Sequence, residues 1–410
     1  MEIEKKEKVY IRNLLLTTLF GGVIGFINYL FNIFIARFTP ESTFALYSTA
    51  IGLIYLIQIP FTSIQNVLTK GMGKTEKGDI TKLKQSSIIS FTLIGIVVSS
   101  LFFILLPIFS DPSQISPELI APLSVALMLT FLSPISRGIL LGQEKIVLVN
   151  SIWFLETVLR FVIGFLGIKM GGNIQILILA SAIPSFLSCI VALPFIKSKK
   201  EEREKIKIDY KAIALMTLSL LLLSAPYTLD LILTPQPLKA EYGALSLIGK
   251  IVYFSCTTVA MVMFARLANQ KSDKGERKTL GVAVLITLFI GIGMSVFIYL
   301  FRDLIISLAF GSKYTEISNY FITYGVLMSA YAVTFMFANF FFSKDSYFYI
   351  FILFFITILQ IILFRGEILN ISSVVTIQIV VYSLLLILTV LYFLFNFICK
   401  QNEREIKKEI

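Results

Sequence analysis

The sequence predicts an all-α integral membrane protein with about twelve transmembrane helices, and three observations predict it. Of the 410 residues, 57% are hydrophobic and only 15% are charged, whereas a soluble domain carries roughly 25% charged residues. The mean hydropathy is +0.86. Apolar runs recur from one end of the chain to the other, and their lengths are close to the roughly 20 residues that a helix needs to cross a bilayer. Most of the surface must therefore face lipid, where a helix satisfies its own backbone hydrogen bonds.

The first apolar run, from about residue 11 to residue 36, is too long for the roughly 7–15-residue core of a signal peptide. We therefore expect it to be the first membrane helix. The alternating apolar and polar pattern of a membrane barrel is missing. The expected spans are 11–36, 43–68, 86–109, 119–142, 147–168, 174–196, 212–233, 241–265, 279–301, 319–342, 347–364 and 372–398.

The distribution of lysine and arginine among the loops predicts the orientation. With the N-terminus in the cytoplasm, 27 of the 36 basic residues fall on the cytoplasmic side, 6 fall outside and 3 lie within spans. Because short cytoplasmic loops of membrane proteins are enriched in Lys and Arg, this split predicts a multi-pass protein with both termini in the cytoplasm. It also favours an even number of spans.

A basic loop near the midpoint divides the chain. We expect an N-terminal six-helix lobe at 1–197, a basic cytoplasmic linker at 198–211, a C-terminal six-helix lobe at 212–398 and a cytoplasmic tail at 399–410. Two short segments at corresponding positions are similar, as expected for an internal repeat. ALYSTA (Ala45–Ala50) begins the second span, and AEYGAL (Ala240–Leu245) begins the eighth. Two such halves are typical of transporters built from repeats.

Composition also excludes several kinds of chemistry. The net charge of +11 is confined to short clusters between apolar spans, so it indicates membrane topology rather than nucleic-acid binding. The three cysteines, Cys189, Cys256 and Cys399, show no metal-binding spacing and no disulfide framework. The chain has no histidine, which removes histidine bases, ligands and proton relays. We predict no catalytic residue, metal site or cofactor.

Four stretches carry a resemblance to a known family. They are IARFTPESTFALYS (Ile35–Ser48) after the first span, RGILLGQEK (Arg137–Lys145) at the end of the fourth, Asp230 followed by Glu241-Tyr-Gly, and IISLAFGSKY (Ile305–Tyr314) after the ninth. In order and position they resemble the polysaccharide flippase family. This family belongs to the multidrug/oligosaccharidyl-lipid/polysaccharide (MOP) exporter superfamily, which also holds the multidrug and toxic compound (MATE) extruders.

The resemblance implies a fold of two six-helix lobes around a central cavity that faces each side of the cytoplasmic membrane in turn. The implied function is transport of a polyprenyl- or dolichyl-linked oligosaccharide across that membrane. The implied assembly is a monomer that works with glycan-assembly proteins. This chain departs from the family pattern near position 45, where it has Ala and the family usually has a neighbouring Gly.

Two charges in the second half are candidate site residues. Lys250 lies nine residues into the eighth span, about 13 Å along the helix at roughly 1.5 Å per residue, so it cannot easily reach a head-group region. It would compensate the anionic phosphate of a lipid-linked sugar, or pair with Asp230 of the neighbouring span. Asp230 would bind a coupling Na⁺ or H⁺, or form a structural or gating salt bridge with Lys250 or Lys239.

The first half contributes four more candidate substrate-binding residues. Glu156 and Arg160 are one helical turn apart, so they either neutralise each other or face the cavity. Arg37 and Arg137 lie at opposite ends of their spans and either reach the head groups or mark the outer and inner mouths of an anion path. Polar residues within spans, Asn28 and Asn32 among them, suit bonds between helices or to sugar. Pro60, Pro134, Pro184 and Pro226 can kink their spans.

Two other functions remain open. A multidrug or cation extruder of the related branch would favour acidic cavity residues, whereas the charges within these spans lean basic. A membrane-embedded glycosyltransferase or polymerase needs a carboxylate or histidine site at a membrane face and usually a sizeable external loop. No loop here exceeds about 17 residues. The sequence therefore favours a flippase over an enzyme.

Overall fold

The computed structural model describes residues 2–73, 80–109, 115–143, 145–171, 173–196, 208–268, 273–311, 313–343 and 348–409. Within these ranges the chain forms helices joined by turns, without a strand. It divides into two compact units, Met1–Leu220 and Leu221–Ile410. Most of the linker expected at 198–211 lies outside the described residues, so the expected division at that linker stays a prediction.

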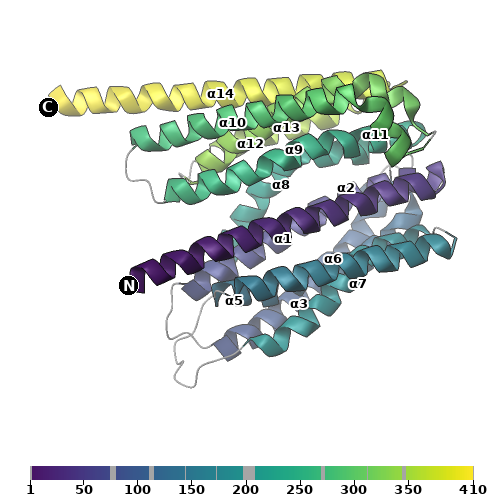
Figure 1. Cartoon of the computed structure of the whole chain (residues 1–410), viewed down its shortest axis with the longest axis horizontal. Coiled ribbons are helices and arrows are strands. Elements are labelled where there is room, and N and C mark those ends of the chain that lie inside the picture. The colour runs from purple at the N-terminus through teal and green to yellow at the C-terminus, as the bar shows by residue number, and fades with distance from the viewer. Residues whose placement is uncertain are drawn as a thin grey trace. The chain divides into compact units, whose positions relative to one another are not determined.

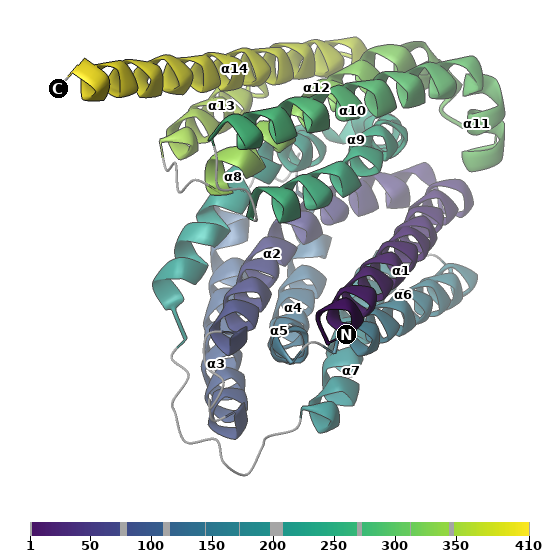
Figure 2. The same ribbon diagram turned by 60° about the vertical axis from the view of Figure 1, so that its left-hand side comes forward.

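Unit 1 places helices that are distant in sequence side by side, since α1 lies beside α6 and α2 beside α5 (Figures 1 and 2). The consecutive helices α6 and α7 also lie side by side. These contacts bring polar residues of α1, α2, α5, α6 and α7 into one unit. The elements are α1 (Glu2–Phe38), α2 (Glu41–Gly73), α3 (Ile80–Phe109), η1 (Pro117–Leu119), α4 (Ile120–Thr130), α5 (Ser133–Gly142), α6 (Ile146–Lys169), α7 (Ile174–Ala192), η2 (Leu193–Phe195) and α8 (Tyr210–Leu233), which continues into unit 2.

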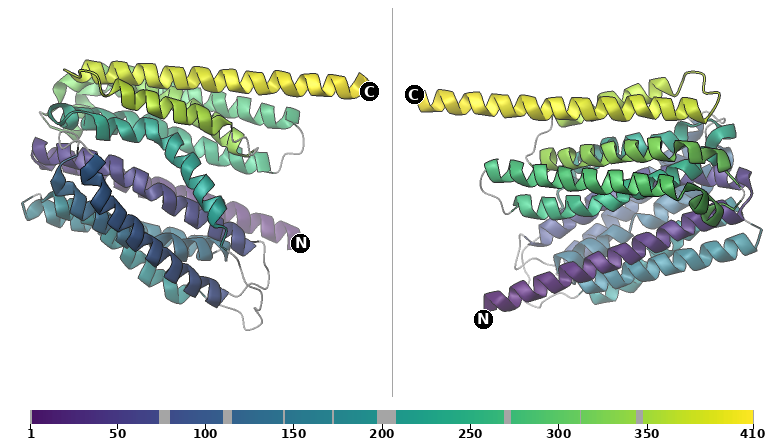
Figure 3. Two further views of the ribbon diagram at one scale, coloured as in Figure 1. Left: turned by 180° about the vertical axis from the view of Figure 1, so that it is seen from behind. Right: turned by 45° about the horizontal axis from the view of Figure 1, so that its top comes forward.

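Unit 2 is organised around α12, which lies beside α9, α10 and α14 (Figure 3). Among the described elements, α14 is the longest and has 39 residues. The elements that follow α8 are η3 (Gln236–Leu238), α9 (Lys239–Ala268), α10 (Asp273–Leu300), α11 (Arg302–Ala309), η4 (Thr315–Tyr320), α12 (Phe321–Ser343), α13 (Tyr349–Leu363) and α14 (Ile371–Glu409).

The expected membrane spans coincide with these helices. Ten described helical segments are long and apolar enough to cross a bilayer. Of the other two expected spans, α9 has 30 residues and α13 is a shorter apolar helix of 15 residues. Large apolar side chains such as Leu285 and Phe289 are 68% and 82% exposed, which suits a lipid-facing surface. The predicted all-α, multi-pass membrane architecture is confirmed.

Pro134 divides the fourth expected span into two helices, α4 and α5. Proline has no N–H, so it cannot donate to the carbonyl four residues earlier, that of Thr130. Ser133 Oγ donates to this carbonyl instead, at 3.1 Å. The break sets the start of α5 and with it the position of Arg137 one turn later. Pro60, Pro184 and Pro226 lie within helices that continue through them.

The stretch between the ninth and tenth expected spans contains two short helices, α11 and η4. Gly311 ends α11 with a φ of 70°, and Tyr314 has a φ of 59° although it is not a glycine. A left-handed glycine is a common helix terminator. Phe310, Gly311 and Tyr314 of the IISLAFGSKY stretch therefore lie between α11 and η4. These two helices are too short to give a periodic signal in the sequence.

Close helix packing in unit 2 depends on small residues. A Cβ atom added to Gly291 would lie 2.6 Å from Ser329 Oγ, and one added to Gly325 would lie 2.7 Å from Ser295 Oγ. These four residues form two small-x-x-x-small pairs that let α10 and α12 approach closely, as membrane helices with such pairs do.

Gly291→Leu should destabilise the protein by about 1–3 kcal/mol, because the added side chain must push Ser329 and α12 away. Gly293→Leu is the matched control, since nothing lies within 4 Å of an added Cβ at that position. Thermal unfolding in detergent measures both variants. Equal stability of the two variants would contradict the packing described for α10 and α12.

Candidate functional site

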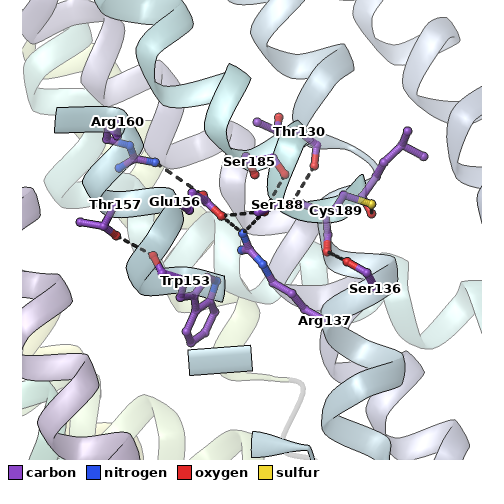
Figure 4. A network of polar contacts seen from close by, with 12 residues as sticks. Thr130, Ser136, Arg137, Trp153, Glu156, Thr157, Arg160, Ser185, Ser188 and Cys189 are labelled. Atoms are coloured by element: carbon purple, nitrogen blue, oxygen red, sulfur yellow. Dashed lines mark hydrogen bonds and ion pairs between the residues drawn. The ribbon is translucent and has the colours of Figure 1, made fainter. Parts of the chain in front are cut away.

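The carboxylate of Glu156 lies at the centre of a polar network in unit 1 (Figure 4). Glu156 Oε2 accepts a hydrogen bond from Arg137 Nη2 of α5 and another of 3.1 Å from Ser188 Oγ of α7. Arg160 Nη2 lies 4.0 Å from Glu156 Oε1, one turn further along α6. One carboxylate therefore joins α5, α6 and α7.

The two arginines are also held from their far sides. The Arg137 guanidinium carbon lies 5.3 Å from the centroid of the Trp153 ring, within the range of a cation–π interaction. Arg160 Nη1 donates to Asn28 Oδ1 of α1 at 2.9 Å. The network continues one turn along α1, where Asn32 Oδ1 accepts a 2.8 Å hydrogen bond from the Tyr47 hydroxyl of α2.

This network has more positive charge than its carboxylate neutralises. Arg137 and Arg160 contribute two positive charges, and Glu156 contributes one negative charge. The three side chains are only 12%, 19% and 10% exposed. Within the described part of the chain, the Nε–H groups of both arginines lack a hydrogen-bond partner. Since leaving a buried donor unsatisfied costs about 1–3 kcal/mol, the site is suited to accept a further anionic oxygen.

The structure brings together residues that the sequence treated separately. Glu156 and Arg160 approach each other, as their spacing indicated, but the shorter contact of Glu156 is with Arg137. Arg137 is therefore engaged inside unit 1 rather than extended towards a head group. Sequence reasoning missed Ser188 and Trp153. Trp153 lies three residues before Glu156 on one helix face, and this spacing could have identified it.

A second polar network, in unit 2, surrounds Asp230 of α8. The Asp230 carboxylate accepts hydrogen bonds from the Tyr242 hydroxyl at 2.7 Å, the Tyr324 hydroxyl at 3.1 Å and the Leu231 backbone N–H at 2.7 Å. Asp230 is fully buried. The tyrosines come from α9 and α12, so this carboxylate joins three helices. Sequence reasoning placed Tyr242 in a motif with Asp230 but identified neither tyrosine as its hydrogen-bond partner.

Lys250 belongs to the same network. Its ammonium nitrogen lies 5.6 Å from the centroid of the Tyr227 ring and interacts electrostatically with Asp230. Lys250 is only 3% exposed. Lys239, the other suggested partner of Asp230, donates to the carbonyl of Ile232 at 3.1 Å. The lysine and the carboxylate thus contribute one positive and one negative charge to the interior of unit 2.

Further polar groups gather one helical turn before Asp230. Gln360 Nε2 of α13 and the Tyr382 hydroxyl of α14 both donate to the carbonyl of Pro226, at 2.9 Å and 3.1 Å. Gln378 lies one turn before Tyr382 on α14 and is fully buried. Among the described residues, neither polar atom of the Gln378 side chain has a hydrogen-bond partner. Such groups usually bind ordered water or an ion.

Arg37 lies apart from the unit 1 network. It is exposed in the last turn of α1, and its guanidinium carbon is 5.8 Å from the centroid of the Phe38 ring. The candidate residues therefore fall into three places: Arg137, Glu156 and Arg160 in the unit 1 network, Asp230 and Lys250 in the unit 2 network, and Arg37 at the end of α1. Among the residues that the structure describes, no group of three His, Cys, Asp or Glu side chains could hold a metal ion.

Comparison with solved structures shows a shared fold. A structure described as the lipid II flippase MurJ, in an inward closed conformation, matches with a TM-score of 0.71 and 17% identity, over 93% of this chain and 87% of that one. An inward-facing multidrug resistance MATE family transporter of the MOP superfamily matches with a TM-score of 0.70 and 14% identity, over 92% and 95%.

A MOP superfamily transporter from Pyrococcus furiosus matches with a TM-score of 0.61 and 13% identity, over 93% of this chain and 94% of that one. The comparison with curated proteins returned no match. The family model described as polysaccharide biosynthesis protein matches residues 10–236, more than half of the sequence. The match covers all three charged residues of the Glu156 network. The chain therefore belongs to the polysaccharide biosynthesis protein family.

Proposed function

We propose that this protein is a flippase that moves a lipid-linked oligosaccharide or polysaccharide precursor across the cytoplasmic membrane by alternating access. The observation that carries the proposal is the Arg137–Glu156–Arg160 network. It is a buried group of charges with a net positive charge, and the Nε–H groups of its arginines have no partner among the described residues. A polyprenyl- or dolichyl-linked sugar carries the phosphate or diphosphate group that such a site would bind.

The chemistry of arginine supports this assignment. Guanidinium groups match phosphate oxygens with parallel N–H donors, and they remain charged inside a protein. A charge within the bilayer is expensive and normally faces a partner or an aqueous cavity. The family description and the name of the MurJ structure, a lipid II flippase, agree with a phosphate-bearing lipid as the substrate.

The remaining candidates fit the same proposal. Lys250 would provide a second positive charge for the substrate, released when its interaction with Asp230 opens. Arg37, exposed at the end of α1, would lie at the outer mouth of the path. With the basic loops in the cytoplasm, both termini of this multi-pass protein would be cytoplasmic. The protein would work as a monomer alongside glycan-assembly proteins.

The surroundings of Asp230 favour a gating or structural role over ion coupling. Three donors already occupy its carboxylate, and Lys250 compensates its charge. A coupling Na⁺ or H⁺ would have to compete with all of them. Gln378 is the observation that favours the ion-coupled alternative, because its polar atoms have no partner among the described residues.

Two other classes are less well supported. A multidrug extruder fits the fold, since the MATE family structures share it, but the excess of arginine in unit 1 favours an anionic substrate. A glycosyltransferase or polymerase would need a catalytic carboxylate or histidine at a membrane face. The chain has no histidine, and the carboxylates of Glu156 and Asp230 are engaged by arginine, serine or tyrosine donors.

The first test is transport by the purified full chain in vesicles that contain a fluorescent polyprenyl-diphosphate-linked oligosaccharide. We expect the wild type to move the probe between leaflets. Arg160→Gln should slow this movement at least tenfold. The substitution removes one of the two guanidinium groups that would bind the phosphate, while the ion pair between Glu156 and Arg137 remains. Arg302→Gln is the matched control, since Arg302 is 38% exposed beside the exposed Asp303. No movement by the wild type, with or without a Na⁺ or H⁺ gradient, would overturn the flippase proposal.

The second test addresses Lys250 and Asp230. We expect Lys250→Ala to fold in membranes but to lose complementation of a flippase-deficient strain. Asp230→Asn and Lys250→Ala should each destabilise the protein, by about 3 kcal/mol for a broken buried pair. The double variant should recover part of that loss, measured as coupling in denaturant unfolding. Full complementation by Lys250→Ala would remove its transport role. An Asp230→Asn variant of wild-type stability that has lost its gradient dependence would support ion coupling instead.

A further inference from the structure

We propose that Glu156 is a built-in competitor for the substrate anion. Its carboxylate occupies the place between Arg137 and Arg160 that the phosphoryl group takes during transport, and it returns there when the anion leaves. The inference rests on the proposed function, because it assigns to this site a phosphoryl-bearing substrate. It adds a residue that sets how tightly that substrate is held.

The geometry of the carboxylate supports this role. Its two oxygens face different guanidinium groups, with Oε2 bonded to Arg137 and Oε1 4.0 Å from Arg160. Two oxygens of a phosphoryl group can bridge a pair of arginines in the same way. Glu156 therefore holds both guanidinium groups in an arrangement that already suits an oxyanion. Inside a helix bundle, burying these arginines without a partner charge would cost free energy.

The two contacts of the carboxylate are unequal, and the inequality indicates where an anion enters. The 4.0 Å separation between Arg160 and Glu156 exceeds hydrogen-bond length. Arg160 is fixed instead by Asn28 on its other side. Its guanidinium is thus oriented but only weakly engaged by Glu156. An incoming phosphoryl oxygen would meet Arg160 first and then displace Glu156 from Arg137.

The charge of Glu156 lowers the net positive charge of the site and therefore its affinity for an anionic substrate. Without Glu156, the two arginines would present two positive charges and would hold a diphosphate strongly. With Glu156, they present one net charge. A transport site must bind its cargo well enough to load it and weakly enough to release it. A carboxylate attached to the site lowers the affinity without removing the donors.

A purely structural carboxylate would behave differently. It would complete the hydrogen bonding of the arginines, and its loss would leave a damaged site that binds anions no better. Here the Nε–H groups of Arg137 and Arg160 lack partners among the described residues even with Glu156 in place. The donors that an anion needs are therefore present before any displacement.

Inorganic pyrophosphate binding to the purified full chain in detergent, measured by calorimetry, tests the inference. Glu156→Gln keeps the size of the side chain and removes its charge. We expect this variant to bind pyrophosphate at least tenfold more tightly than the wild type, equivalent to about 1.4 kcal/mol, and to transport more slowly because release is slower. Glu118→Gln is the matched control, since this exposed carboxylate of η1 lies outside the network. Its affinity should match that of the wild type.

Ser188→Ala provides a second variant that keeps all three charges. It removes the 3.1 Å hydrogen bond that Ser188 Oγ donates to Glu156 Oε2, together with a 3.4 Å bond that Ser188 Oγ accepts from Arg137 Nη2 and a 2.8 Å bond to the carbonyl of Ser185. The carboxylate should therefore leave more easily, and pyrophosphate should bind a few-fold more tightly. If Glu156→Gln does not fold, pyrophosphate binding by Ser188→Ala tests the inference in its place. Unchanged or weaker pyrophosphate binding by the folded Glu156→Gln, or by Ser188→Ala in its place, would overturn the inference.

The outcomes separate this inference from the proposed function. If the wild type moves the lipid-linked probe but Glu156→Gln binds pyrophosphate no more tightly, the competitor role fails and the flippase proposal stands. If Glu156→Gln binds more tightly but the wild type moves no probe in vesicles, the anion site stands and the flippase proposal fails.

Discussion

The interaction on which the account depends is the contact of one buried carboxylate, Glu156, with two buried arginines. Burying an ionised group in a low-dielectric interior costs several kcal/mol unless it is paired and hydrogen-bonded. Arg137 therefore needs Glu156, and Glu156 gains a further donor in Ser188. Because these residues come from α5, α6 and α7, the same contact both holds the helices of unit 1 together and creates the site.

Unit 2 also contains a buried carboxylate, and different residues offset the free-energy cost of burying it. Asp230 is stabilised by hydrogen bonds from two tyrosine hydroxyls and by the opposite charge of Lys250. Three described donors already engage the Asp230 carboxylate, whereas the Nε–H groups of the two arginines in unit 1 have no partner among the residues that the structure describes. This contrast is why we assign anion binding to the first network and a gating or structural role to the second.

The membrane fold could be predicted from the sequence because lipid imposes long apolar helices, and all twelve expected spans coincide with helices. The missing N–H of proline made a kink at Pro134 possible, but this rule did not distinguish Pro134 from Pro60, Pro184 and Pro226, whose helices continue. The approach of Arg137 to Glu156 could not be predicted, because the two are 19 residues apart and their contact depends on how α5 packs against α6. Tyr242 and Tyr324 were not identified as partners of Asp230 for the same reason, although Tyr242 belongs to the Glu241-Tyr-Gly motif. Single aromatic residues in apolar helices give no sign of their partners.

The most direct test of the central claim uses Trp153, the single tryptophan of the chain, whose ring lies against Arg137. Titration of the purified protein with pyrophosphate should give a saturable change in tryptophan fluorescence, because the anion alters the position of the Arg137 guanidinium over the ring. Arg160→Gln should weaken this response at least tenfold. An unchanged Trp153 signal at saturating pyrophosphate, in a preparation that transports the lipid-linked probe, would contradict anion binding at the Glu156 network.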